Sequence, residues 1–367
     1  MSSLLRASGP GMALDALRTP LLSARSKLLM RRVLVDAVRM RRSLSYEDHE
    51  ARAAVDGESV AEYCRRRLNQ EIHDYVVDPL LGGLFLVDPD EMPAVDFFFT
   101  VAKMLGGKML AYPPGMDFLC RALAQRVDVR TGAAVHAVER DGDGVVVRWR
   151  EGGEERSERV AGCVVATSAP VAADLCNGLG ERRLEIMTDG LAQANVIAGH
   201  FALSAPAPRD DVVVLTIPRR EGRGLGVVVF EQVSSPSCVP EGKGLVSGFW
   251  YHDWSTPRLE RSDEELRGEM LPMLELVLPG VTGTIEFVRI KRWAPSNVRS
   301  RPGTHRLVAE LDAAVDPADR VQLAGDYLGF PSANGCAISG EVAAHRLALA
   351  LQGRESPSTT SSSSVAV

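Results

Sequence analysis

The sequence has no run of 18 or more apolar residues, so no segment of it is predicted to cross a membrane. The first apolar residues are interrupted by Arg6, Gly9, Pro10 and Asp15, which argues against a signal peptide. The six cysteines show no CxxC and no paired spacing typical of a metal site. We therefore expect reduced, buried thiols, a reducing compartment and a cytoplasmic protein.

A basic overall balance is also missing. The net charge of -6 and the pI near 5.7 argue against a general nucleic-acid-binding protein. Residues 1–42 are the exception, because they carry nine Lys and Arg against two Asp, a net +7 that leaves -13 for the remainder. Two interpretations stay open for this basic and partly apolar segment. It forms either a solvated helix face, the commoner case, or a peripheral contact with an anionic membrane surface.

Signatures of metal and hydrolase chemistry are equally scarce. His200, His252 and His305 lie in strand-like or turn contexts without metal-ligand spacing, so we interpret them as structural histidines and predict no metal site. No G-x-S-x-G stretch is present to support a Ser-His-Asp hydrolase.

The length of 367 residues and the 45% hydrophobic content predict a large core divided between two lobes. Helical spacing runs through residues 20–56, and a second helix is predicted over 59–75, where Ser59 and Glu62 have capping-box spacing. Prolines and glycines break the apolar stretch 76–99, which predicts irregular structure beside a cavity.

Strand patterns dominate after residue 112. The Asp-Gly-Asp-Gly turn at 141–144 predicts a hairpin, several β-rich runs fill 194–254, and 284–293 reads as another strand. A helix is predicted over 262–277 because Ser262 and Glu265 have capping spacing. Strand character returns at 305–311 and 320–330, a helix is expected at 340–351, and the Ser/Thr-rich residues 354–367 are predicted to be a disordered tail.

The stretch "VQLAGDYLGFPSANGCAISGEVAA" places Asp326 just after the end of a predicted strand and an Asn-Gly turn before a helix rich in small residues. Such residues let the backbone approach a ligand closely. A carboxylate at a strand end can accept hydrogen bonds from sugar or ribityl hydroxyls, and N–H groups near Asn334 and Ala337 can face a phosphate or a flavin carbonyl. The alternative is ordinary helix-entry chemistry without a ligand.

This stretch resembles the C-terminal FAD motif of the superfamily of flavin amine oxidases, protoporphyrinogen oxidases and carotenoid desaturases. "PPGMDFLCRALAQRVDVRTGAAVHAVERDGDGVVVRW", "CVVATSAP" and "IKRWAPSNVRSRPG" are similar to three further segments of these proteins, and "VDPLLGGLFLVDPDEMP" most resembles the protoporphyrinogen oxidase branch. The resemblance implies FAD as cofactor and assigns these cofactor-binding residues: Val135, Ala166, Thr167, Trp293, Gly325, Asp326, Asn334, Gly335 and Ala337.

The sequence departs from this superfamily in two places. The paired glycines before a helix are replaced by Pro114 and Gly115, and no strand–GxGxxG–helix unit is present, since "GPGMAL" and "GRGLGVV" lack the third glycine and the strand–helix context. That unit normally holds the pyrophosphate, so we expect weak or absent FAD binding by this chain alone. We also expect an open edge on the parallel sheet that a partner chain or a second copy could cover.

The amine oxidases of the superfamily use a lysine near flavin N5, and "NVIAGHFAL", where it would be expected, has none; Lys291 is a poor substitute. This favours dehydrogenation of a large apolar substrate, tetrapyrrole-like or polyene-like, by residues that the sequence does not identify. "FFFTVAKMLGG" and "GLFLV" line such a pocket or, more simply, pack in the core. A non-catalytic remnant or subunit that binds a partner chain is the alternative function.

The resemblance implies an α+β (α/β) fold with two lobes: an incomplete Rossmann-like FAD lobe and a substrate lobe of mixed β-sheet plus helices. Residues 1–105 are expected to form the helical part of the substrate lobe and 171–299 its β-sheet part. Residues 106–170 and 300–353 are expected to form the two parts of the FAD lobe.

Overall fold

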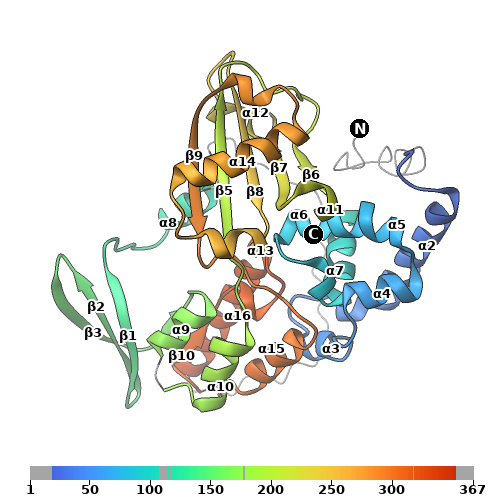
Figure 1. Ribbon diagram of the computed structural model, residues 1–367. Helices are drawn as coiled ribbons and strands as arrows, with labels where there is room; N and C mark the ends of the chain where they lie inside the picture. The colour runs from blue at the N-terminus through green and yellow to red at the C-terminus, as the bar shows by residue number, and fades with distance from the viewer. Residues whose placement is uncertain (1–18, 107–114, 116, 177, 317, 353–367) are drawn as a thin grey trace. The chain divides into compact units, whose positions relative to one another are not determined.

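The computed structural model describes residues 19–106, 115, 117–176, 178–316 and 318–352 (Figure 1). They combine helices and sheets, as the α+β prediction requires, and separate into two compact units. Unit 1 takes the described residues up to 45 together with 54–129 and 193–303, whereas unit 2 takes 46–53, 130–192 and 304–352. The predicted lobe boundaries stay a prediction, and each unit is described by itself.

Unit 1 contains a five-stranded antiparallel sheet in the order β6-β7-β8-β5-β9. Helix α14 (Asp263–Val277) lies along this sheet and buries Leu266, Met270 and Leu274 in a core with Phe201 and Trp250 (Figure 1). The helix begins at Ser262 with the predicted capping box. The strands are β5 (Val196–Leu203), β6 (Val214–Thr216), β7 (Leu225–Phe230), β8 (Gly244–Trp250) and β9 (Ile285–Trp293).

The remaining described part of unit 1 is largely helical. Its longer helices are α2 (Ala24–Arg39), α4 (Val60–Arg67), α6 (Asp78–Phe85), α7 (Ala94–Gly106) and α8 (Phe118–Ala124). The short ones are α5 (Gln70–Ile72), α11 (Arg219–Gly222), α12 (Glu231–Ser234) and α13 (His252–Ser255), with a π-helical turn at His73–Val77 and 3-10 turns at Arg41–Ser43, Pro89–Glu91, Pro236–Cys238, Thr256–Arg258 and Val281–Thr284.

The prediction of irregular structure over 76–99 was wrong, because α6 and the first residues of α7 lie within this stretch. Pro79 lies in the first turn of α6, where a missing N–H costs nothing. A Cβ on Gly82 would lie 2.5 Å from the Tyr251 hydroxyl, and one on Gly83 would lie 2.6 Å from Thr216 Cγ2. These glycines therefore mark close packing of a helix, not a turn.

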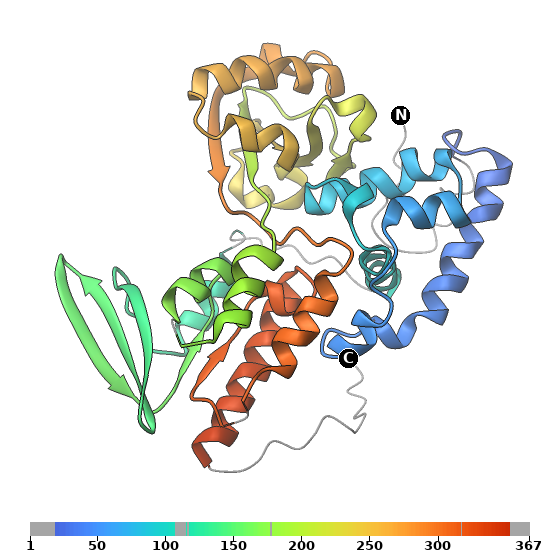
Figure 2. The same ribbon diagram turned by 60° about the horizontal axis from the view of Figure 1, so that its bottom comes forward.

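Unit 2 holds two sheets. The first is antiparallel, in the order β1-β2-β3, and its β1–β2 hairpin turns at the predicted residues 141–144. The second is parallel and consists of β10 and β4, with α16 beside β10 (Figure 2). The strands are β1 (Ala134–Asp141), β2 (Gly144–Glu151), β3 (Glu154–Val160), β4 (Cys163–Val165) and β10 (Val321–Leu323); the helices are α3 (His49–Ala53), α9 (Ala169–Leu175), α10 (Glu181–Glu185), α15 (Thr304–Ala313) and α16 (Ala333–Gln352), with a π-helical turn at Ile186–Gly190 and a 3-10 turn at Asp326–Leu328.

Three further predictions of element type or length were wrong. Residues 305–311 form part of α15, where His305, Val308 and Leu311 are buried at helical spacing. The helix expected at 340–351 begins already at Ala333. The helix expected over 59–75 keeps its capping box but ends at Arg67, since a new cap begins at Asn69.

Candidate functional site

The two parallel strands of unit 2 end side by side and bring four of the predicted site residues together. Ala166 and Thr167 directly follow β4. The strand β10 ends at Leu323, and Gly325 and Asp326 come after the single intervening residue Ala324. The Ala324 amide donates a hydrogen bond of 3.0 Å to the Val165 carbonyl oxygen, which continues the ladder to the point where the strands diverge. The carboxyl ends of parallel strands are where open α/β sheets bind ligands.

Gly325 is required at this point by space. A Cβ at this position would lie 2.5 Å from Cε1 of the Tyr327 ring and 3.1 Å from the carbonyl oxygen of Thr167. The Gly325 amide donates to Ser339 Oγ at 3.0 Å, which ties the end of β10 to the first turns of α16. The two strand ends and the helix are therefore packed backbone to backbone, as a close cofactor cradle requires.

Asp326 offers a hydrogen-bond acceptor at this edge. Its side chain is half-buried, and burial raises the pKa of its carboxyl while hydrogen bonds from its own amide and that of Tyr327 lower it. Within the described ranges, no side chain donates to this carboxylate. The geometry thus leaves acceptor capacity for the hydroxyl groups of a ligand.

The start of α16 differs from the prediction of an Asn-Gly turn before a helix. Asn334 and Gly335 lie inside the first turn, because Ser332 Oγ accepts a 3.0 Å hydrogen bond from the Gly335 amide. A Cβ on Gly335 would lie only 2.2 Å from the Phe330 carbonyl oxygen, so the chain turns tightly into the helix. Asn334 and Ala337 are exposed. The positive end of a 20-residue helix dipole is therefore accessible to an anion or a carbonyl oxygen.

Val135 lies in the same unit but on the other sheet. It is 41% exposed on β1, opposite Trp149, at a bulge between Val135 and Ala137. An exposed apolar side chain at a bulged strand suits contact with a flat ring, as the predicted adenine contact requires. Val135 thus belongs to the sheet β1-β2-β3, separate from the sheet of β4 and β10.

Trp293 lies in unit 1, at the end of β9. Its ring is 48% exposed, and the Lys291 ammonium stands 5.0 Å from the ring centroid. The structure therefore brings together seven of the nine predicted residues around β4, β10 and α16, and leaves Val135 on a second sheet and Trp293 in the other unit.

The residues around β4, β10 and α16 match one part of FAD and not another. Glycines that admit no Cβ, an acceptor carboxylate without a side-chain donor and an accessible helix start fit the ribityl and flavin end. The sequence contains no GxGxxG motif between a strand and a helix to supply donors for a pyrophosphate. The residue pair Pro114 and Gly115 straddles the limit of the described residues, so the predicted consequence for that turn stays a prediction.

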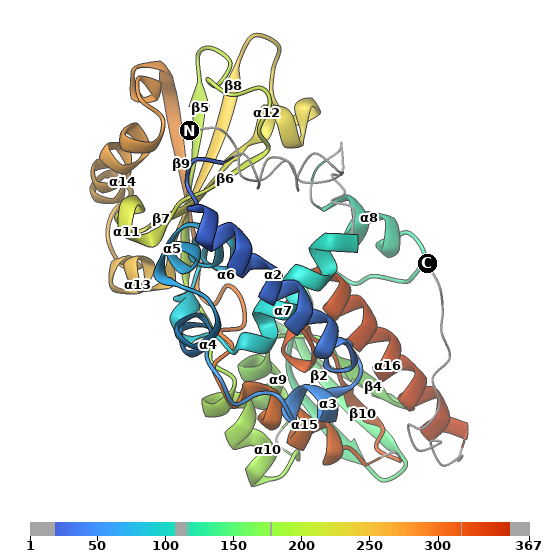
Figure 3. The ribbon, with the colours of Figure 1, turned by 90° about the vertical axis from the view of Figure 1, so that its right-hand side faces the viewer.

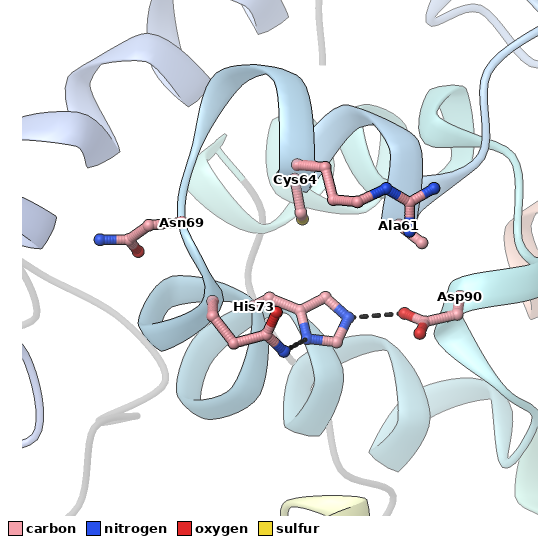
Figure 4. Close-up of a pocket in the computed structure, with 7 residues that line it drawn as sticks. Ala61, Cys64, Asn69, His73 and Asp90 are labelled. Carbon is pink, nitrogen blue, oxygen red and sulfur yellow. Dashed lines mark hydrogen bonds and ion pairs between the residues drawn. The ribbon is translucent and has the colours of Figure 1, made fainter.

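Sequence reasoning missed a charged constellation in unit 1. His73 Nε2 lies 2.5 Å from Asp90 Oδ1 beside a cavity of about 220 Å³ (Figure 4). The other ring nitrogen, Nδ1, lies 2.8 Å from Asp74 Oδ1. A second cavity of about 170 Å³ adjoins it and is lined by Asp78, Asp88 and two arginines. The signal was a His-Asp pair followed by three acids within 17 residues.

This constellation does not form a nucleophilic site. The two carboxylates, chiefly Asp90, raise the pKa of His73 to about 9, so the imidazole is a cation with both nitrogens engaged and not a base. Burial raises the pKa of the nearby Cys64 thiol to about 12, which removes the thiolate. We interpret these groups as an ion network that holds the helices of unit 1 together.

The three histidines named from the sequence have structural surroundings. His200 Nδ1 lies 2.8 Å from Ser247 Oγ, which donates to Glu231, and His252 Nδ1 accepts from the Asn195 amide at 2.9 Å. His305 is 2% exposed. Across the described part of the chain, no three His, Cys, Asp or Glu side chains are grouped so that they could hold a metal ion.

Comparison with known proteins identifies the family. Residues 14–348 match the model of the family described as flavin containing amine oxidoreductase. The chain belongs to this family. Because the match spans most of the sequence, both units are parts of one family fold, as the resemblance in the sequence implies.

Solved structures share the fold at low identity. Cyclohexylamine oxidase from Brevibacterium oxydans IH-35A is 15% identical with a TM-score of 0.63, and the superposition covers 91% of this chain and 76% of the oxidase chain. Putrescine oxidase bound to putrescine is 15% identical with a TM-score of 0.68, and the superposition covers 91% of this chain and 76% of the putrescine oxidase chain. A protein named "Putative protoporphyrinogen oxidase" from Exiguobacterium sp. 255-15 is 17% identical with a TM-score of 0.60, and the superposition covers 93% of this chain and 77% of that protein's chain. The fold is that of FAD-dependent oxidoreductases.

Proposed function

We propose that this member of the family is an FAD-dependent oxidoreductase that dehydrogenates a large apolar substrate, tetrapyrrole-like or polyene-like. The observation that carries the cofactor is the packed junction of β4, β10 and α16, with Gly325 against the Thr167 carbonyl and Asp326 beside it. The substrate class rests on the lack of an amine-oxidase lysine.

The residues at this junction would hold the ribityl and flavin end of FAD. Asp326 would accept hydrogen bonds from ribityl hydroxyls, and the N–H groups at the start of α16 would face an electronegative ring edge. A bound flavin would take a hydride from the substrate and pass the electrons to oxygen or another acceptor. The chain itself would orient the cofactor and exclude water from the reacting face.

Two observations support an apolar substrate over an amine. The buried strand β5 carries no lysine at any position, and Lys291 on the neighbouring strand is exposed and stacks on Trp293. The motif stretch "VDPLLGGLFLVDPDEMP" resembles the protoporphyrinogen oxidase branch. Phe97, Phe98 and Phe99 do not contribute to a pocket, because each is 1% exposed and packs in the core, as the simpler interpretation predicted.

We further propose that the chain alone holds FAD weakly. Each charge-assisted hydrogen bond to a pyrophosphate contributes ~1.5–3 kcal/mol. Three missing bonds would weaken binding by roughly 3 to 6 orders of magnitude. The purified chain is therefore expected to keep little flavin, and to gain it when a strand–GxGxxG–helix unit is supplied.

The experiment compares the full chain alone with the full chain coexpressed with, or fused behind, a strand–GxGxxG–helix unit from a related oxidase. Flavin retained after gel filtration is measured first, by absorbance and by FAD release. Turnover is then measured with a protoporphyrinogen-like tetrapyrrole, a polyene and a panel of amines. Turnover of an amine alone would refute the substrate class, while failure to hold flavin in either form would refute the cofactor proposal.

A second candidate function, binding of a partner chain, is favoured by the state of the parallel sheet. Within the described residues β4 and β10 pair only with each other, although Val165, Val321 and Gln322 are at most 4% exposed. Parallel sheets are usually larger, and an unpaired strand edge is a template for pairing with another strand. Size-exclusion chromatography with light scattering separates the two functions: a stable homo-oligomer or complex that never retains flavin would favour the binding function.

A further inference from the structure

Helix α2 presents an apolar stripe to solvent. Leu28, Leu34, Val35 and Val38 are between 47% and 65% exposed. At 100° per residue, Leu28, Val35 and Val38 fall within one side of the helix, opposite the buried Ser26, Val33 and Ala37. The helical spacing seen in the sequence is therefore correct, but these apolar residues do not face the core.

Basic side chains lie within and beside this stripe. Arg25, Lys27, Arg31, Arg32 and Arg39 lie on α2, and Arg41 and Arg42 follow it directly. Within the described ranges Arg25, Arg31, Arg41 and Arg42 form no ion pair. These arginines are exposed. The outward surface of α2 thus combines apolar side chains with unneutralised positive charge.

The inner side of α2 is fixed, so the helix cannot turn its apolar stripe inward. Asp36, the one acid on the helix, accepts hydrogen bonds of 3.0 Å from Nε and Nη2 of Arg67 and one of 3.1 Å from the Tyr63 hydroxyl. Near the other end, Glu71 accepts hydrogen bonds from Ser23 and Ser26. Figure 3 shows α2, in dark blue, in front of the other helices of unit 1.

We propose that the outward face of α2 docks on an anionic lipid surface. An interfacial helix needs apolar side chains that enter the headgroup region and basic side chains beside them, and α2 supplies both on one face. Each Lys or Arg near an anionic leaflet adds to the attraction, which falls off within a Debye length. In the described residues no helix is long and apolar enough to cross a bilayer.

An acidic protein partner fits the outward face of α2 less well than a lipid surface does. The apolar side chains are separated by arginines along a single 16-residue helix and form a narrow stripe, whereas stable protein interfaces bury a broad apolar centre with depleted charge. This alternative is an outcome of the test.

The test is sedimentation of the full chain with vesicles. One set is phosphatidylcholine alone, and the other is phosphatidylcholine with phosphatidylserine at about 3:1. We expect at least about tenfold stronger binding to the second set, and a marked loss when salt is raised from ~0.1 M to ~0.5 M. Equal binding to both sets, or no binding to either, overturns the proposal and leaves a protein partner as the better account.

The apolar contribution is tested with Leu28→Ser/Val35→Ser. Both side chains are exposed, so the variant is expected to fold, which circular dichroism and urea unfolding check. Binding to the anionic vesicles should fall about tenfold. The matched control is Leu276→Ser/Phe287→Ser, which removes side chains 52% and 56% exposed elsewhere in unit 1. Equal losses in the two variants overturn the assignment to α2.

The charge contribution is tested with Arg31→Gln/Arg42→Gln against the control Arg267→Gln/Arg289→Gln, which lowers the net charge equally at other exposed positions. Only the first pair should weaken binding, and its residual binding should depend less on salt. If both pairs weaken binding alike, the attraction is a property of the whole chain's charge and the proposal fails.

Discussion

Arg140 and Asp319 form a bidentate ion pair that joins the end of β1 to the turn before β10. Arg140 Nε donates to Asp319 Oδ1 at 2.9 Å and Nη2 donates to Oδ2 at 2.5 Å. Asp319 Oδ1 also accepts from the Val321 amide at 2.9 Å, and the carboxylate is 7% exposed. The pair therefore sets the position of the strand that leads to Asp326.

We expect Asp319→Ala to lower the free energy of unfolding by ~1–3 kcal/mol, because it leaves the guanidinium and a strand amide without their acceptor. Urea unfolding of the full chain measures this change. Glu341→Ala, which removes an exposed carboxylate from α16, is the control and should change stability by less than about 0.5 kcal/mol. Equal effects would show that the pair adds nothing to stability.

Asp326→Ala is expected to weaken flavin binding without a comparable loss of stability. Loss of charge-assisted hydrogen bonds to hydroxyl groups costs ~1–3 kcal/mol, or about 5-fold to 150-fold in Kd. Fluorescence titration with FAD, using the form that carries a strand–GxGxxG–helix unit, measures it, and Glu341→Ala again provides the control. Unchanged affinity in Asp326→Ala would remove this carboxylate from the cofactor site.

Two glycines of α16 should respond to alanine in opposite directions. Gly335→Ala places a Cβ against the Phe330 carbonyl, a backbone atom that cannot move aside cheaply, and should destabilise the fold by ~1–3 kcal/mol. Gly340→Ala meets nothing within 4 Å and should stabilise the helix by about 0.5–1 kcal/mol. The two unfolding curves compare the sites within one helix. A stabilising Gly335→Ala would contradict the tight helix entry.

Local signals predicted some elements well because their cause is local. Both capping boxes, at Ser59 and at Ser262, depend only on residues three positions apart, and the hairpin at 141–144 depends on its own turn residues. The end of β10 just before Asp326 was also visible, since the apolar run "VQLA" is followed at once by Gly325. These features need no knowledge of tertiary contacts.

Other features depend on distant partners, which a single sequence does not display. Gly82 and Gly83 read as breakers, although their task is to let Tyr251 and Thr216 approach a helix. The network at His73 needs a carboxylate 17 positions away, and the run of acids after His73 does not show which of them reaches the ring. Asp319 was similarly inconspicuous until its pairing with Arg140 was seen.

Stability should fall as the pH rises through the interval in which His73 loses its proton. The pKa of His73 is raised from 6.5 to about 9 by hydrogen bonds to Asp90 and Asp74, against the opposing effect of burial. A group whose folded pKa is raised contributes stability that is complete below the unfolded pKa and lost through the folded pKa. Urea unfolding of the full chain should therefore lose up to about 3 kcal/mol between pH 6.5 and just above pH 9.

The other described histidines with shifted pKa do not obscure this interval. Burial lowers the pKa of His49 to about 4 and also lowers those of His200 and His252, so their effects on stability fall below pH 6.5. Burial raises the pKa of the Cys176 thiol to about 11, so its effect begins only near pH 9. His73→Gln should be less stable at pH 6.5 and nearly as stable as the parent above pH 9, with a flat profile between. A parallel profile in the variant would assign the pH dependence to other groups and reduce the network at His73 to packing alone.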